Sequence, residues 1–122
     1  MTENSNSKRV YDLEERTYTF ARDCRMFIKT LPKTIANNDD ARQLVKASGS
    51  VGANYIEANE SLSKKDFLMR IKICRKESKE SACWLRLIDD TNELRNADEA
   101  KRLKNEAIEL KKIFSAIIDK SS

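Results

Sequence analysis

Residues 63–88 read SKKDFLMRIKICRKESKESACWLRLI, and this stretch indicates the fold class. Its apolar and small residues recur at spacings of three and four, the period of one face of an α-helix. The residues on that face are Phe67, Ile71, Cys74, Ser78, Ser81, Leu85 and Ile88. Ser63 and Asp66 have the spacing of a capping box, with Asp in place of the usual Glu. The pattern predicts a long helix that begins after Ser63 and buries one side.

The same period recurs in three other segments. The first contains Leu13, Thr17, Phe20, Cys24, Phe27 and Leu31, and Pro32 then ends the helix. The second follows the capping candidates Asn37, Asn38 and Asp39 and contains Ala41, Leu44, Val45, Ser48, Val51, Gly52, Tyr55 and Ile56. The third follows the capping pair Asn96 and Glu99 and carries Leu103, Ala107, Leu110, Phe114 and Ile117 toward Lys120. The chain therefore contains four predicted helices.

The composition agrees with an all-α fold. Only two glycines and one proline interrupt 122 residues, a length that suits one domain. Short connections favour antiparallel neighbours. We expect an antiparallel, up-down-up-down four-helix bundle over residues 11–120, after a flexible polar tail over residues 1–10. The small residues Ala47, Ser48, Gly52 and Ala53 predict that another helix approaches this part of the second helix closely.

Several classes of function lack the residues they need. The chain has no histidine, and Cys24, Cys74 and Cys83 form no C-x-x-C pair, so neither a usual zinc site nor a disulfide framework is predicted. Glu14, Glu15, Glu57 and Glu60 lack the histidines of di-iron bundles. No phosphate-binding loop, nucleophile elbow, signal peptide or membrane span is recognisable. We expect a cytoplasmic, non-enzymatic protein without cofactor or metal.

Basic residues gather beside the apolar face of residues 63–88. At about 100° per residue, one stripe collects Lys65, Lys72, Arg75, Lys76, Lys79 and Arg86, whereas Asp66, Glu77 and Glu80 fall on another side. Such a stripe can follow a phosphate backbone, and it predicts binding of RNA or DNA. The alternative is a solvated face whose cations pair with acidic residues of neighbouring helices.

A second apolar strip runs along the same segment. Met69, Ile73, Trp84 and Leu87 project well away from the predicted core face. An interface between subunits would cover this strip, and an aromatic residue such as Trp84 suits such a place. We expect a homo-oligomer. The alternative is a broad core face that reaches Trp84 and leaves Met69 and Leu87 exposed.

Two segments resemble a known family. Residues 43–58, QLVKASGSVGANYIEA, resemble a signature of the 23S rRNA intervening-sequence proteins, also called the four-helix bundle protein family. The resemblance continues through residues 63–67, residues 71–81 and Trp84-Leu85. Asn54 and Glu57 match the Asn and Glu of the family's Asn-Ile-Ala-Glu-Gly core, whereas Tyr55, Ile56 and Ala58 depart from it. From the residues alone, Asn54 and Glu57 could hydrogen-bond across the bundle or cap an adjoining turn.

The resemblance implies a fold and possible partners. The resemblance to this bacterial family implies a cyclic pentamer in which each subunit is an antiparallel four-helix bundle. A related branch is the accessory variability determinant of diversity-generating retroelements, a basic pentamer that partners a reverse transcriptase and binds nucleic acid. We therefore weigh two functions: an oligomer that binds RNA or DNA through the basic stripe, and a protein-interaction or accessory subunit whose partner is a reverse transcriptase or a ribosome-associated protein.

Overall fold

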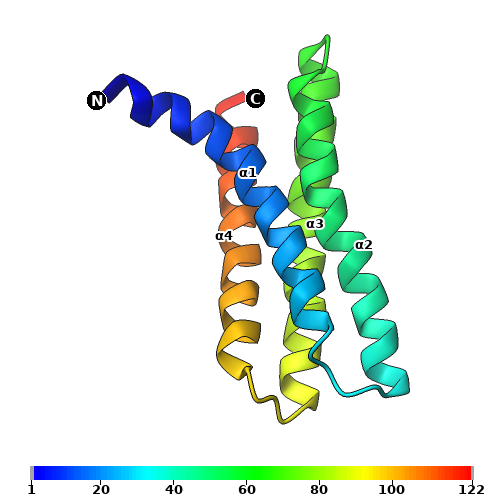
Figure 1. Ribbon diagram of the computed structural model, residues 1–122. Helices are drawn as coiled ribbons and strands as arrows, with labels where there is room; N and C mark the ends of the chain where they lie inside the picture. Colours follow the sequence, from blue (N-terminus) through cyan, green and yellow to red (C-terminus); the bar gives the residue numbers. More distant parts are fainter. Residues whose placement is uncertain (1, 122) are drawn as a thin grey trace.

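The computed structural model describes the backbone of residues 2–121 and the side chains of residues 13–121. It contains four helices, α1 (Thr2–Ile28), α2 (Ile35–Asn59), α3 (Lys64–Thr91) and α4 (Ala97–Ser121). Consecutive helices run in opposite directions, and α1 lies against both α2 and α4 (Figure 1). The predicted all-α, antiparallel four-helix bundle is confirmed. No helix within residues 2–121 is both long enough and apolar enough to span a bilayer.

The N-terminal part of α1 extends beyond its predicted apolar stripe. The sequence predicts a flexible tail over residues 1–10, whereas the backbone of residues 2–10 is helical. This segment is polar and carries no apolar stripe, so a search for buried faces does not detect it. Figure 1 shows the first turns of α1 running past α4, away from the other helices. The helix α1 is therefore longer than the apolar stripe from which it was predicted.

The bundle core is built from one face of each helix. Every residue of the predicted first stripe is buried, from Leu13 to Leu31. The largest fully buried side chains include Phe20, Phe27, Phe114, Leu44, Ile71, Leu85, Ile88, Leu103 and Leu110. The prediction was wrong for Ile56, which is 47% exposed, while Ala58 is buried in its place. Ile56 follows the buried Tyr55 by one residue, and a turn of about 100° carries it out of the core.

The N-terminal caps of the helices were only partly predicted. Ser63 caps α3 as expected, and its Oγ accepts a hydrogen bond from the Asp66 backbone N–H at 3.1 Å. The cap of α2 is Thr34, whose Oγ1 accepts from the Asn37 N–H at 3.1 Å. The predicted capping residues Asn37, Asn38 and Asp39 lie inside α2. The start of α2 was misplaced because Ile35 and Ala36, the apolar residues of its first turn, are exposed and belong to no buried stripe.

Three buried or half-buried asparagine side chains link the ends of the helices. The side chains of Asn37 and Asn92 donate hydrogen bonds to each other at 2.8 Å, and Asn37 also donates to the Pro32 carbonyl. Before α4, the Asn96 side chain donates to Thr30 Oγ1 at 3.1 Å, and only its carbonyl accepts from the Glu99 N–H. Asn96 and Glu99 therefore do not act as the predicted capping pair, because the Asn96 side chain instead donates to Thr30, in the turn after α1.

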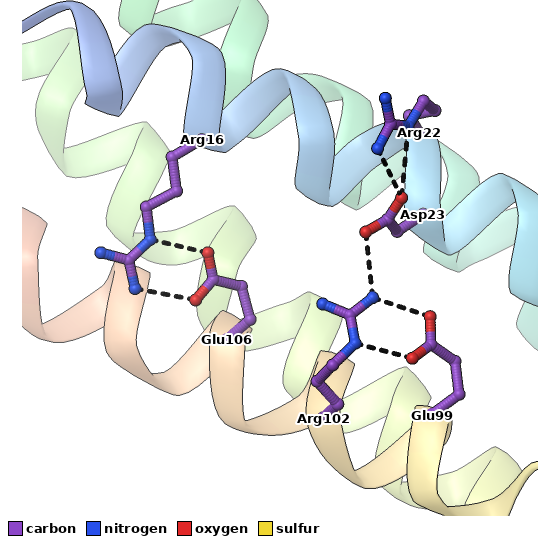
Figure 2. Close-up of polar contacts among 6 residues, drawn as sticks. All are labelled: Arg16, Arg22, Asp23, Glu99, Arg102 and Glu106. Atoms are coloured by element: carbon purple, nitrogen blue, oxygen red, sulfur yellow. Dashed lines mark hydrogen bonds and ion pairs between the residues drawn. The ribbon is translucent and has the colours of Figure 1, made fainter.

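Ion pairs connect α1 with α4. Arg16 binds Glu106, and Arg102 binds both Glu99 and Asp23, the latter at 2.9 Å (Figure 2). Hydrogen bonds to Glu99 and Asp23 raise the pKa of Arg102 above its ordinary range. These pairs lie on the side of α4 that faces α1. The candidate site lies on a different side of α4, next to α3.

Candidate nucleic-acid interface

Four residues of the predicted basic stripe line one open depression between α3 and α4. They are Lys72, Arg75, Lys76 and Lys79, and α4 adds Lys111 and Ser115. The depression has a volume of about 460 Å³. We call these six residues the basic groove. The two outer members of the predicted stripe, Lys65 near the start of α3 and Arg86 near its end, do not line it.

The cations of the basic groove are not neutralised by local salt bridges. Within residues 13–121, no carboxylate lies within 4.0 Å of the side-chain nitrogens of Lys72, Arg75, Lys76, Lys79 or Lys111. By contrast, Arg86 pairs with Asp90 at 3.7 Å. Asp90 lies on α3 with Arg86, so within residues 13–121 no ion pair of the stripe matches the alternative prediction of pairing with acidic residues of neighbouring helices.

The acidic residues in the middle of α3 lie on the side toward α2. Glu77 lies beside Ser50 of α2 and beside Glu80 of α3. Burial, followed by the contact with Glu80, raises the pKa of Glu77. Negative charge in this part of α3 is therefore gathered beside α2, while the groove beside α4 keeps its positive potential.

Lys111 and Ser115 are the two residues of the basic groove that were not predicted from the sequence. They belong to a different helix from the stripe, and the sequence does not fix which turns of two antiparallel helices lie at the same level. One signal was available. Lys111 and Ser115 are four residues apart and flank the buried Leu110 and Phe114, so they lie at an edge of the core face of α4.

A larger depression elsewhere lacks this excess of positive charge. It has a volume of about 510 Å³ and lies where the loop before α4 meets the end of α1. Its lining residues are Thr30, Pro32, Glu93, Leu94, Arg95 and Asn96. One cation and one anion leave no net charge there. The size of a depression alone therefore does not identify the candidate site, whereas its charge does.

The second apolar strip of α3 is only partly exposed. Met69 is 51% exposed and Leu87 is 41% exposed. Ile73 and Trp84 are half-buried, and Trp84 packs against the core. The core face therefore does reach Trp84, as the alternative prediction stated, yet four apolar side chains still share one solvent-accessible side of α3.

Asn54 hydrogen-bonds across the bundle, as one of its two predicted roles requires. Its amide donates to the Ser50 carbonyl and hydroxyl at 2.9 Å, and its Oδ1 accepts from Arg70 Nη1 at 3.0 Å. The contact with Arg70 joins α2 to α3. Glu57 is exposed, and its backbone carbonyl accepts hydrogen bonds from Ser61 and Glu60 at the end of α2.

The cysteines and carboxylates form no recognisable reactive cluster. Cys24 and Cys74 are fully buried, as predicted, and burial raises the pKa of each thiol to about 12. Cys83 is exposed. In the part of the chain that the structure describes, no three His, Cys, Asp or Glu side chains lie close enough together to hold a metal ion.

Comparisons with known proteins agree with this fold. Residues 10–116 match the model of the family described as 23S rRNA-intervening sequence protein. A similar solved structure is a protein of unknown function from the S23 ribosomal protein family of Bacteroides thetaiotaomicron VPI-5482, determined at 1.70 Å resolution. The TM-score is 0.76 at 24% sequence identity, over 87% of this chain and 97% of that chain. A search of curated proteins gives no match.

Proposed function

The chain belongs to the 23S rRNA-intervening sequence protein family, as the resemblance of residues 43–58 predicted, and we propose that it binds RNA or DNA through the basic groove. The proposed role is non-catalytic. One observation carries it: Lys72, Arg75, Lys76 and Lys79 of α3 line a single depression with Lys111 of α4. No ion pair among residues 13–121 involves these five charges.

The chemistry of the groove suits phosphate. Lysine and arginine neutralise phosphates and release the counterions condensed on a nucleic acid, which supplies sequence-independent affinity. Arg75 can also bind a phosphate through two nitrogens at once, while Ser115 can donate a hydrogen bond to a phosphate oxygen. Such contacts position a backbone and carry little sequence information. The proposed binding is therefore sensitive to salt and tolerant of sequence.

Self-association would extend this surface. We propose that the strip of Met69, Ile73, Trp84 and Leu87 is an interface between copies of the chain, in an oligomer for which the family resemblance suggests five subunits. Each subunit then contributes one basic groove. Several grooves on one assembly raise the effective affinity for a long nucleic acid without any new contact.

A charge-reversal experiment tests the proposed function. The variant combines Lys72→Glu and Lys76→Glu, and the matched control combines Lys29→Glu and Lys46→Glu, two exposed lysines outside the groove. Both variants change the net charge by the same amount. We expect the groove variant to lose measurable binding to structured RNA and duplex DNA in about 0.1 M salt, while the control keeps most of it.

The control also defines failure. Equal loss in both variants would mean that net charge, not the groove, attracts the nucleic acid. No binding by the unmodified protein would contradict the proposal. A protein captured from lysate after nuclease treatment, and lost in the groove variant, would then identify the groove as a surface for an acidic protein partner.

A further inference from the structure

The basic groove contains no side chain on which a base could stack. Its lining consists of four lysine and arginine residues of α3, one lysine of α4 and Ser115, with no aromatic residue among them. Trp84 lies on a different side of α3, among the second apolar strip. Proteins that bind single strands usually combine a basic channel with aromatic side chains on which the bases stack, and this stacking adds to the affinity. The groove lacks that contribution.

Electrostatic attraction alone favours the ligand with the higher charge density. A duplex carries one negative charge per about 1.7 Å of its axis, twice the density of either strand at the same rise. For five phosphate contacts, log K against log salt has a slope of about −4.5 for a duplex and about −3.5 for a single strand. Lowering the salt from about 1 M to about 0.1 M therefore strengthens duplex binding about tenfold more.

The spacing of the cations also suits a rigid backbone. Lys72 and Lys79 are separated by seven residues, or about 10 Å along α3, with Arg75 and Lys76 between them. Phosphates on one strand of a duplex recur every 3.4 Å along the axis, so this row spans about three phosphate steps. A duplex holds its phosphates in that order before binding. A flexible single strand must be ordered first, which costs conformational entropy.

From this lining and spacing, and resting on the proposed function, we infer that the basic groove binds double-helical nucleic acid by its phosphate backbone in preference to single strands. The ligand class is a duplex of any sequence. Lys111 is a contact residue of this site, because it supplies the only positive charge that α4 adds to the groove lining. The row on α3 and the single lysine on α4 together approach the backbone from two sides.

The test compares one labelled strand of about 20 nucleotides, designed without self-complementarity, with the same strand annealed to its complement. Fluorescence anisotropy gives Kd at three salt concentrations for RNA and for DNA. We expect both duplexes to bind at least about tenfold more tightly than the single strands in about 0.1 M salt. Lys111→Ala should make the salt slope for the duplexes shallower by about 1.

Lys112→Ala is the matched control, because Lys112 is the next residue of α4, lies outside the groove and pairs with Glu109 at 3.7 Å. It should leave the slope unchanged. Single strands that bind as tightly as duplexes, and lose binding in the Lys72→Glu/Lys76→Glu variant, would overturn the duplex preference but keep the proposed function. An unchanged slope for Lys111→Ala would also overturn the inference. Absence of binding to every probe would contradict the proposed function itself.

Discussion

Arg16 of α1 and Glu106 of α4 form a two-pronged ion pair, in which Nε lies 2.7 Å from Oε2 and Nη2 lies 2.8 Å from Oε1 (Figure 2). The two side chains are 37% and 22% exposed. Parallel hydrogen bonds between a guanidinium and a carboxylate are stronger than a single contact, although partial exposure to water weakens them. This pair joins the first and last helices, so it closes the ring of four helices.

The first prediction concerns Glu106→Gln. Removing the negative charge breaks the charge-assisted bonds to Arg16 while keeping the size of the side chain. We expect the free energy of unfolding to fall by about 1 kcal/mol in urea titrations. Glu109→Gln is the control, because Glu109 pairs with Lys112 within α4 and both side chains are more than half exposed. Its effect should stay below about 0.5 kcal/mol. Equal effects of the two substitutions would contradict a special role for the α1–α4 pair.

The two glycines of α2 should respond differently to alanine. A Cβ at Gly49 would lie 3.1 Å from Nη2 of Arg25, the end of a flexible, exposed side chain. A Cβ at Gly52 would lie 3.3 Å from Oγ1 and 3.6 Å from Cβ of Thr17, which is buried on α1. Alanine favours a helix over glycine by about 1 kcal/mol. We expect Gly49→Ala to stabilise the protein by up to about that amount, because Arg25 can move aside.

Gly52→Ala should gain less, because Thr17 is fixed in the α1–α2 contact. Gly52→Leu extends this comparison, since the larger side chain must separate the two helices, and we expect a loss of about 2 kcal/mol or more. Thermal unfolding of the three variants measures the order. A stability for Gly52→Leu equal to that of the unmodified protein would mean that α1 and α2 do not approach closely at this residue.

Periodicity predicted most of the core because the burial of one side of a helix determines the spacing of apolar residues along that same helix. Phe20, Cys24 and Phe27 are buried since one side of α1 faces the other helices, and their spacing alone reveals it. The cap at Thr34 and the reciprocal amide pair of Asn37 and Asn92 were not predictable in this way. They depend on how the chain turns between helices and on which helix ends come together.

The candidate site shows the same division. The row from Lys72 to Lys79 follows from the sequence because all its members lie on one helix. Lys111 joins them only through the register between α3 and α4, which is set by packing along the whole interface. Arg86 was predicted to belong to the same binding stripe, but its charge pairs with Asp90, an acidic residue one turn away on α3.

Reactivity of the cysteines gives a third prediction. Burial raises the pKa of Cys24 and Cys74 to about 12, and a protonated, inaccessible thiol is a poor nucleophile. Iodoacetamide at pH 8 should therefore add one group to the folded protein, at the exposed Cys83, and three groups in denaturant. Intact-mass analysis counts the adducts, and peptide mapping locates them. Modification of Cys24 or Cys74 in the folded protein would show that the core opens on the timescale of the reaction.

The same shifts predict how stability depends on pH. The two thiols have a pKa of about 12 in the folded state and near the ordinary thiol value of 9.0 when unfolded. Below pH 9 both states keep these protons, so the contribution is fully present. Between pH 9 and pH 12 the unfolded state loses them first, and the free energy of unfolding falls. The Cys24→Ala/Cys74→Ala variant lacks these thiols, so its free energy of unfolding should fall less from pH 9 to pH 11. The lysines titrate in both proteins and therefore do not account for the difference.

The last prediction concerns self-association through α3. Leu87→Glu and Met69→Glu each place a carboxylate within the second apolar strip, and burial of an unpaired charge in an interface costs several kcal/mol. We expect light scattering after size exclusion to show a smaller assembly for either variant, with an unchanged helical circular-dichroism spectrum. Leu62→Glu is the control, because Leu62 is fully exposed in the turn before α3 and lies outside the strip. An unmodified protein that is monomeric at all concentrations would exclude this strip as an interface. Strip variants with the same mass as the unmodified assembly would exclude it too. A smaller assembly in the Leu62 variant alone would place the interface at the tip of the α2–α3 hairpin.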